Sequence, residues 1–379
     1  MERRSTMEGL EINMEITKGL VEKNDIAYIH KKAKSEFKKL AGHSVLLIGS
    51  NGFLGYYFVK SILAWNEEHP TAQIDLTALS TYRAGVPLWL KKIAKAGKVK
   101  ILKKDITKFT IPTKTTYDYI IHGASIASPI YYRLHPIETI NANVQGLYKL
   151  LDYLLRRKDT NQPIKGLLFF STSEIYGNPT PDNVPTPETY NGNVSCTGPR
   201  ACYDESKRFC ETLIVNYVQV HKLPIKSARP FNNYGPGLRI NDKRVIPDFA
   251  NDILHNKDVV MLSNGGPKRT FCYITDAIVG YLKILIKGKP GEAYNIGIET
   301  PEITMKDLAT KMQEIAAKEF GYKGKIITKV SDDKAYLTDN PQRRCPKIDK
   351  AKTELGYEPS VSVDQGLVNT LLWYKENMQ

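Results

Sequence analysis

The chain alternates between short, uninterrupted apolar runs and longer stretches whose apolar side chains recur every three to four residues. A short apolar run bounded by glycine or polar residues is typical of a buried strand, whereas the longer spacing is typical of a helix. Strands that alternate with helices predict a parallel sheet in a doubly wound α/β fold. The expected strands are 44–48, 74–79, 99–102, 117–121, 167–170 and 225–229.

The first expected strand, 44–48, runs directly into a glycine-rich turn, and a helical run over 57–65 follows it. Glycine lets the backbone turn tightly and approach a pyrophosphate, which then binds to the free N–H groups of the helix N-terminus. A strand before the turn and a helix after it are the context that this motif requires. We therefore expect a Rossmann-type dinucleotide site. Its candidate residues are Gly49, Asn51, Gly52, Phe53, Leu54 and Gly55.

The second expected strand, 74–79, is followed by Ser80, where a site for NAD usually has an acid that binds the adenosine ribose. The missing acid and the nearby Arg83 favour tolerance of a 2′-phosphate. Alternatively, Ser80 or Thr81 bonds the ribose and Arg83 covers the adenine. Both interpretations leave Ser80 and Arg83 as candidate cofactor contacts.

Later strands bring further candidates to the same edge, because ligands of open α/β sheets bind outside the carboxyl ends of the strands. Asp105 and Ile106 follow the third strand and are placed to contact the adenine. Ala124 and Ser125 follow the fourth, and their small side chains let the backbone pass close to a cofactor.

Tyr203 and Lys207 are four residues apart, so a helix would place them on one face, one turn from each other. A phenol is a poor base near neutral pH, and a lysine ammonium beside it lowers its pKa. Such a pair can take a proton from a sugar hydroxyl. The spacing also recurs by chance in amphipathic helices, so a catalytic role for the pair is supported only when the nucleotide site is considered with it.

Composition narrows the class of protein. The net charge of the 379 residues is +14, but the lysines are scattered without a nucleic-acid-binding module, so we expect a basic surface that helps attract a small anionic substrate. The five cysteines form no C-x-x-C pair, which argues against zinc and disulfides and favours a reducing, cytoplasmic setting. The most apolar window, 45–65, is interrupted by polar residues. We therefore expect no metal, no membrane and no nucleic-acid partner.

Together these motifs resemble the extended short-chain dehydrogenase/reductase enzymes of the nucleotide-sugar epimerase/dehydratase type, over residues 43–375. The stretches 171–177, 198–205 and 340–344 are most similar to the UDP-glucuronate decarboxylases, or UDP-xylose synthases. The resemblance implies NAD-dependent decarboxylation of UDP-glucuronate to UDP-xylose through a 4-keto intermediate. It also implies a homodimer formed through the helix that carries Tyr203 and its neighbour. NAD is favoured because a cofactor that is oxidised and reduced again within one turnover gains nothing from the NADP pool.

The resemblance also implies roles for individual residues. Tyr203 is the base that deprotonates the sugar O4, and Lys207 lowers its pKa and binds the nicotinamide ribose. Thr172 and Ser173 hydrogen-bond around the sugar, and Glu174 assists the chemistry at C5. Further positions implied to line the cofactor or the nucleotide-sugar substrate are Asn143, Tyr217, Asn232, Arg244 and Arg344.

The pattern becomes less regular from about residue 235, where several arginines follow the nucleotide-binding half. Their planar guanidinium groups are suited to clamp a diphosphate, and the candidates are Arg239, Arg244, Arg269 and Arg344. We therefore expect an N-terminal helical extension over 1–42, an NAD-binding Rossmann domain with the catalytic residues over 43–234, and a mainly substrate-binding region over 235–379. Asp25 is expected to cap a helix in the extension.

Two related reactions begin with the same oxidation and stay open, a 4,6-dehydratase and a 4-epimerase of another nucleotide sugar. Enzymes of the first kind usually have an aspartate in the place of Ser173, and those of the second commonly lack a glutamate at Glu174, so both positions favour decarboxylation. The chain differs from the decarboxylases at Leu262 and Ser263, where a tyrosine and a glycine are usual. The nucleobase of the substrate therefore stays open.

Overall fold

A parallel sheet forms the centre of the computed structural model, which describes residues 19–83, 85–331, 333 and 338–377. Its seven strands follow the order β11-β6-β5-β4-β1-β2-β3, and every neighbouring pair is parallel. The predicted doubly wound α/β fold is thus confirmed. The strands are β1 (Ser44–Ile48), β2 (Asp75–Ser80), β3 (Lys100–Lys103), β4 (Tyr119–His122), β5 (Gly166–Phe170), β6 (Ile225–Pro230) and β11 (Ala293–Ile296).

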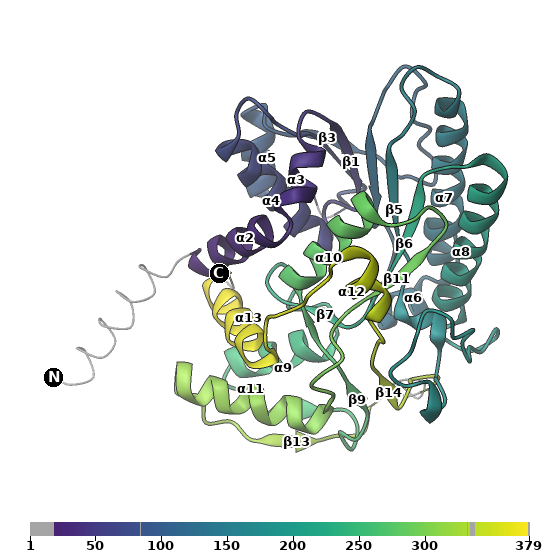
Figure 1. Cartoon of the computed structure of the whole chain (residues 1–379). Helices are drawn as coiled ribbons and strands as arrows, with labels where there is room; N and C mark the ends of the chain where they lie inside the picture. The colour runs from purple at the N-terminus through teal and green to yellow at the C-terminus, as the bar shows by residue number, and fades with distance from the viewer. Residues whose placement is uncertain (1–18, 84, 332, 334–337, 378–379) are drawn as a thin grey trace.

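Helices cover both faces of this sheet (Figure 1). Because side chains alternate across a strand, Val45 and Leu47 of β1 pack with α4 (Phe53–Glu68) and α10 (Ile274–Lys287). Leu46 and Ile48 point to the opposite face and pack with α7 (Pro136–Lys158) and α8 (Ala201–His221). The short helices α5 (Leu88–Lys95) and α6 (Pro129–Leu134) complete this half of the molecule.

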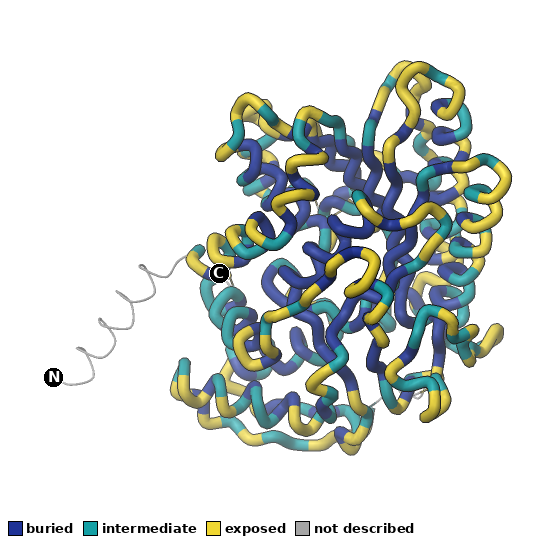
Figure 2. Tube along the Cα trace, viewed as in Figure 1, coloured by how far each residue is buried: buried dark blue, intermediate teal, exposed yellow. Residues whose placement is uncertain are grey.

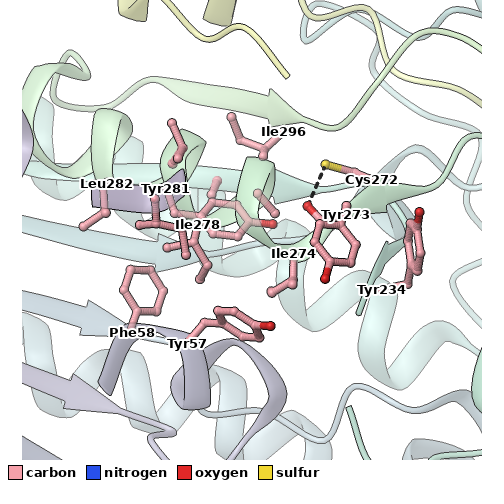
Figure 3. Packing of buried hydrophobic residues seen from close by; sticks show 14 of the residues in the cluster. Tyr57, Phe58, Tyr234, Cys272, Tyr273, Ile274, Ile278, Tyr281, Leu282 and Ile296 are labelled. Carbon is pink, nitrogen blue, oxygen red and sulfur yellow. Dashed lines mark hydrogen bonds between the residues drawn. The ribbon is translucent and has the colours of Figure 1, made fainter. Parts of the chain in front are cut away.

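The core between α4 and α10 is rich in aromatic residues (Figure 3). Tyr57 and Phe58 of α4 lie opposite Ile274, Ile278 and Tyr281 of α10, and all five side chains are at most 1% exposed. This packing joins the helix that follows the glycine turn to a helix more than two hundred residues further along the chain.

Two helices precede the sheet, α2 (Leu20–Lys32) and α3 (Lys34–Leu40), and α2 packs against α4, α10 and α13 (Val363–Asn377) (Figure 1). The expectation that Asp25 caps a helix is wrong, because Asp25 lies inside α2. Its buried carboxylate accepts hydrogen bonds from the hydroxyls of Tyr57 at 2.5 Å and Tyr273 at 2.8 Å. Residues 1–18 of the expected extension lie outside the described residues.

The C-terminal region forms small sheets beside the carboxyl ends of the central strands. Arg269 of β9 (Lys268–Arg269) is in register with Arg344 of β14 (Arg343–Arg344), and β12 (Ile303–Thr304) pairs antiparallel with β9. The division at residue 234 stays a prediction, and α10 and β11, which follow it, pack in the central sheet half. The other elements are β7 (Asn233–Tyr234), α9 (Val245–Leu254), β8 (Val259–Met261), β10 (Cys272–Tyr273), α11 (Met305–Phe320), β13 (Ile326–Thr328) and α12 (Asp349–Leu355).

Buried residues form a continuous layer through the central sheet and its covering helices (Figure 2). Across the described ranges, no helix is long and apolar enough to cross a membrane. The same residues contain no group of three or more histidine, cysteine or acidic side chains that could hold a metal ion.

Candidate active site

One cleft of about 1120 Å³ follows the carboxyl ends of the central strands and continues between the sheet half and the C-terminal region. It is lined by the glycine turn, by the ends of β2 to β6, and by residues of the C-terminal region. Every residue predicted for the cofactor, the substrate or catalysis lines it except Asn143 and Tyr217. Residues more than two hundred positions apart thus meet at one edge of the sheet.

The glycine turn leaves no room for larger side chains. Gly49 has φ +90, and a Cβ there would lie 2.7 Å from the backbone carbon of Gly123. A Cβ at Gly55 would lie 2.6 Å from the carbonyl oxygen of Gly49. Because α4 begins at Phe53, its unpaired N–H groups open into the cleft beside this turn. The turn is therefore suited to a pyrophosphate.

The catalytic pair lies where β5 and α8 meet. Tyr203 is in the first turn of α8, and Lys207, one turn later, donates from Nζ to the carbonyl of Phe170 at 2.7 Å. The Lys207 Nζ is 5.9 Å from the centroid of the Tyr203 ring. Thr172, two residues beyond β5, hydrogen-bonds the Tyr203 hydroxyl. The Thr172 Oγ1 also accepts a hydrogen bond from the N–H of Glu174 at 3.2 Å. This bond caps the start of the short helix η1 (Ser173–Tyr176).

Burial controls the protonation of this pair. It raises the pKa of Tyr203 to about 12, although the hydrogen bond from Thr172 opposes the rise. It lowers the pKa of Lys207 to about 8. The expected lowering of the Tyr203 pKa by Lys207 is therefore not found in this structure, because the phenol is buried away from water. Tyr203 is held here as a neutral phenol at pH 7.

Glu174 lies in an ion-paired cluster with two arginines. Its Oε2 accepts from Nη2 of Arg200 at 2.7 Å, and both of its oxygens accept from the guanidinium of Arg344. Burial by itself raises the pKa of Glu174, but the two guanidinium groups outweigh it and hold that pKa at about 2. The cluster is therefore ionised at neutral pH and carries one net positive charge at the wall of the cleft.

Arg269 holds the segment that carries Arg344. Its guanidinium donates to the side-chain oxygen of Asn340 at 3.0 Å and to the carbonyls of Pro341 at 2.6 Å and Gln342 at 3.3 Å. Since these contacts take most of its donors, its main contribution in this structure is to position the 340–344 segment. It also lines the cleft, so contact with a diphosphate stays a prediction.

The chain matches a known protein family over most of its length. The sequence model of the NAD dependent epimerase/dehydratase family matches residues 45–297. The chain belongs to this family. The predicted NAD cofactor agrees with it, and the glycine turn described above fits such a dinucleotide, because any side chain at Gly49 or Gly55 would collide with backbone.

Curated members of the family give a finer comparison. The chain is 35% identical to UDP-glucuronic acid decarboxylase 3 of Arabidopsis thaliana over 323 residues, 85% of this chain and 86% of that one. It is 30% identical to UDP-glucuronic acid decarboxylase 1 of Xenopus tropicalis over 335 residues, 88% of this chain and 73% of that one. The predicted resemblance is thus confirmed.

Solved structures agree on the fold. A UDP-glucose 4-epimerase of Thermotoga maritima, crystallised with UDP-glucose, superposes with a TM-score of 0.73 at 21% identity and covers 89% of this chain and 100% of that one. The dTDP-glucose 4,6-dehydratase DesIV of Streptomyces venezuelae, crystallised with NAD, has a TM-score of 0.72 at 23% identity, with 88% and 98% covered. Both confirm the fold of the family.

Two predicted residues lie outside the cleft. Asn143 is completely buried behind it, where it accepts from Ser125 at 2.7 Å and donates to Ser206 of α8 at 2.8 Å. It therefore supports the cleft wall instead of contacting a ligand. Tyr217 is on α8 about four turns beyond Tyr203, roughly 20 Å away along the axis, and packs beside His221. Its assignment to the substrate was wrong.

Sequence reasoning missed Arg200 and Tyr132. Arg200 precedes α8, pairs with Glu174, and lies 5.8 Å from the centroid of the Tyr132 ring. Tyr132, in α6, packs against the ring of Tyr203. Arg200 stands within the 198–205 stretch that carries the resemblance, but no spacing rule distinguishes a buried ion pair from a surface arginine.

Proposed function

We propose that the chain decarboxylates UDP-glucuronate to UDP-xylose with NAD as its cofactor. The observation that carries the proposal is the Glu174 cluster with Arg200 and Arg344, placed in the same cleft as Tyr203 and the glycine turn. A dehydratase acid at the neighbouring position is replaced by the hydroxyl of Ser173. The relatives named as decarboxylases support this choice over the other reactions of the family.

Each group of residues has a separate role in the proposed reaction. The glycine turn and Lys207 would hold NAD, which would supply a hydride acceptor for C4 of the sugar and a hydride donor for its reduction afterwards. As a phenolate, Tyr203 would accept the proton of the O4 hydroxyl. The hydrogen bond from Thr172 and the positive charge of bound NAD would stabilise that phenolate against the burial that keeps the phenol neutral in this structure. The net positive charge of the Glu174 cluster attracts the sugar carboxylate.

Loss of carbon dioxide follows from the ketone at C4, which accepts the electron pair of the breaking C5–C6 bond. This step moves negative charge from the carboxylate toward O4, where the phenol of Tyr203 can donate a proton, and the enolate that forms then takes up a proton at C5. Ionised Glu174 assists by holding Arg200 and Arg344 in place beside the C5 carboxylate.

We also propose a homodimer formed through α7 and α8, which pack side by side at one edge of the molecule (Figure 1). Large apolar side chains on these helices are exposed, and a monomer gains nothing from them. The exposed fraction is 64% for Ile137, 42% for Tyr148, 46% for Phe209 and 70% for Val220.

The reaction is tested by incubating the purified protein with NAD and UDP-glucuronate and following the nucleotide sugar by mass spectrometry. The expected product has lost carbon dioxide, and none forms with Tyr203→Phe. Substrate of unchanged mass contradicts the proposal. A panel of other nucleotide sugars tests the alternatives, since loss of water indicates a dehydratase and an isomer indicates an epimerase. The panel should vary the nucleobase, because Leu262 and Ser263 line the cleft.

A further inference from the structure

The adenosine end of the cleft is positively charged. In Rossmann-type sites the ribose lies beside the end of the second strand, where an acid usually binds its hydroxyls. Here β2 ends at Ser80, and the Ser80 carbonyl accepts the N–H of Lys104 at 3.1 Å. Since β2 and β3 are neighbouring strands, this bond places the backbone of Lys104 beside the end of β2, and the Lys104 ammonium lies 5.8 Å from the centroid of the Phe109 ring.

Two more cations line the same end, Arg83 and Lys108. The preceding Tyr82 has φ 46 and is buried, with its hydroxyl bonded to the hydroxyl of Ser50 at 2.8 Å. This anchor fixes the turn after β2, from which Arg83 enters the cleft wall. None of Arg83, Lys104 and Lys108 forms an ion pair with a carboxylate in the described part of the chain.

The opposing charge at this end is small. Asp105 is the acid that lines it, and its Oδ1 already accepts from the N–H of Thr107 at 3.0 Å and from the Thr107 hydroxyl at 2.8 Å. In an NAD site, the acid at the end of the second strand both bonds the ribose hydroxyls and repels a 2′-phosphate. Ser80 can do only the first. A phosphate monoester, with a charge of about −1.5 to −2, therefore meets three cations.

We propose that this end of the cleft accepts a 2′-phosphate, so that NADP binds in the same site as NAD with comparable affinity. The inference rests on the proposed function only in taking the cleft as a dinucleotide site. The proposed reaction regenerates its cofactor within each turnover, so either dinucleotide can serve the same chemistry.

The test measures binding separately from activity. Bound nucleotide is removed from the full chain, and dissociation constants for NAD and NADP are measured by isothermal titration calorimetry at low and high salt. The two constants should agree within about tenfold, and that for NADP should depend more steeply on salt. NAD binding with NADP more than a hundredfold weaker overturns this inference alone. Binding of neither dinucleotide overturns the inference and the proposed function together.

Single substitutions test which residues are responsible for NADP binding. Arg83→Ala and Lys104→Ala should each weaken NADP about tenfold and leave NAD within twofold. Ser80→Asp should weaken NADP at least tenfold, because it restores the repelling carboxylate while keeping an acceptor for the ribose. Lys91→Ala, on the exposed face of α5 and outside the cleft, is the control and should change neither constant. Equal losses of NAD and NADP affinity in Arg83→Ala would place Arg83 over the adenine and overturn the proposal.

Discussion

The ring of Tyr132 lies parallel to the ring of Tyr203, with the centroids 5.0 Å apart and the planes inclined by 7°. Tyr132 is buried and lies outside the cleft lining, so it can affect the reaction only through its contact with the Tyr203 ring. The guanidinium of Arg200 lies 5.8 Å from the centroid of the Tyr132 ring and holds Glu174. The stack therefore links the carboxylate cluster to the phenol as a positioning device.

Tyr132→Leu should lower kcat about tenfold and leave KM for the nucleotide sugar within twofold, because a lost aromatic pair costs about 0.5–1.5 kcal/mol and frees the Tyr203 ring. Tyr132→Phe keeps the ring and should retain at least half of the wild-type kcat. Steady-state kinetics and thermal unfolding measure the two variants side by side. Equal losses of kcat in both would show that the hydroxyl, and not the stack, matters.

Tyr203→Phe should lower turnover by roughly 10²–10⁴, because the phenylalanine has no group to accept the O4 proton. The dissociation constant for NAD should change by no more than a few-fold, since the ring and its stack on Tyr132 remain. Single-turnover assays and calorimetric titration with NAD check both expectations. Loss of NAD binding would show that the hydroxyl serves the cofactor first.

Glu174→Gln leaves two buried guanidinium groups without a counter-charge and should lower the free energy of unfolding by about 3–5 kcal/mol near pH 7. The pKa of Glu174 is depressed from 4.5 to about 2, so its ionic contribution is present above pH 4.5 and is lost as the pH falls toward 2. The stability difference between wild type and variant should shrink as the pH falls below 4.5. Urea unfolding at several pH values measures it. A difference that stays the same from pH 5 to pH 2.5 would contradict the depressed pKa.

The contribution of Asp25 to stability depends on pH in the opposite direction. Burial raises its pKa from 3.8 to about 7, so between these values the folded protein holds a proton that the unfolded chain has lost. Its contribution to stability therefore falls as the pH rises through this range, by on the order of 4 kcal/mol. Relative to Asp25→Asn, the wild type should lose stability between pH 4.5 and 7.5. Asp152→Asn, at an exposed ion pair of α7, is the control and should show no such trend.

Phe209→Glu should dissociate the proposed dimer, because it places a charge among the exposed apolar side chains of α7 and α8. Val330→Glu is the matched control, since Val330 is 94% exposed and lies far along the chain in the C-terminal region. Sedimentation velocity should give a monomer for the first variant and a dimer for the second. A wild-type protein that sediments as a monomer would contradict the proposed interface.

Much of this molecule could be predicted from local pattern. The apolar runs gave the strands, and the strand–turn–helix context placed the glycine turn, because both signals lie within a few adjacent residues. The resemblance gave Arg344 only as a substrate contact, and its ion pair with Glu174 was not predicted. Arg344 lies 170 positions away, and only the pairing of β9 with β14 brings it to the cleft.

The failures have physical causes as well. Tyr217 was assigned by resemblance alone, and it lies about four turns beyond Tyr203 in α8, away from the cleft. Asp25 has the side chain of a capping residue, but the hydroxyls of Tyr57 and Tyr273 draw it into the core. Tertiary partners of this kind leave no signal in the spacing of the residue itself.

The contact between Asp25 and the two tyrosines also decides how much of the chain folds as one unit. Tyr57 belongs to the helix after the glycine turn, and Tyr273 to the strand just before α10. A truncated chain that began at Ser44 would keep every residue of the cleft and yet bury both hydroxyls without their acceptor. We therefore expect the unit that folds on its own to include α2, which precedes residues 45–297 that the family model matches.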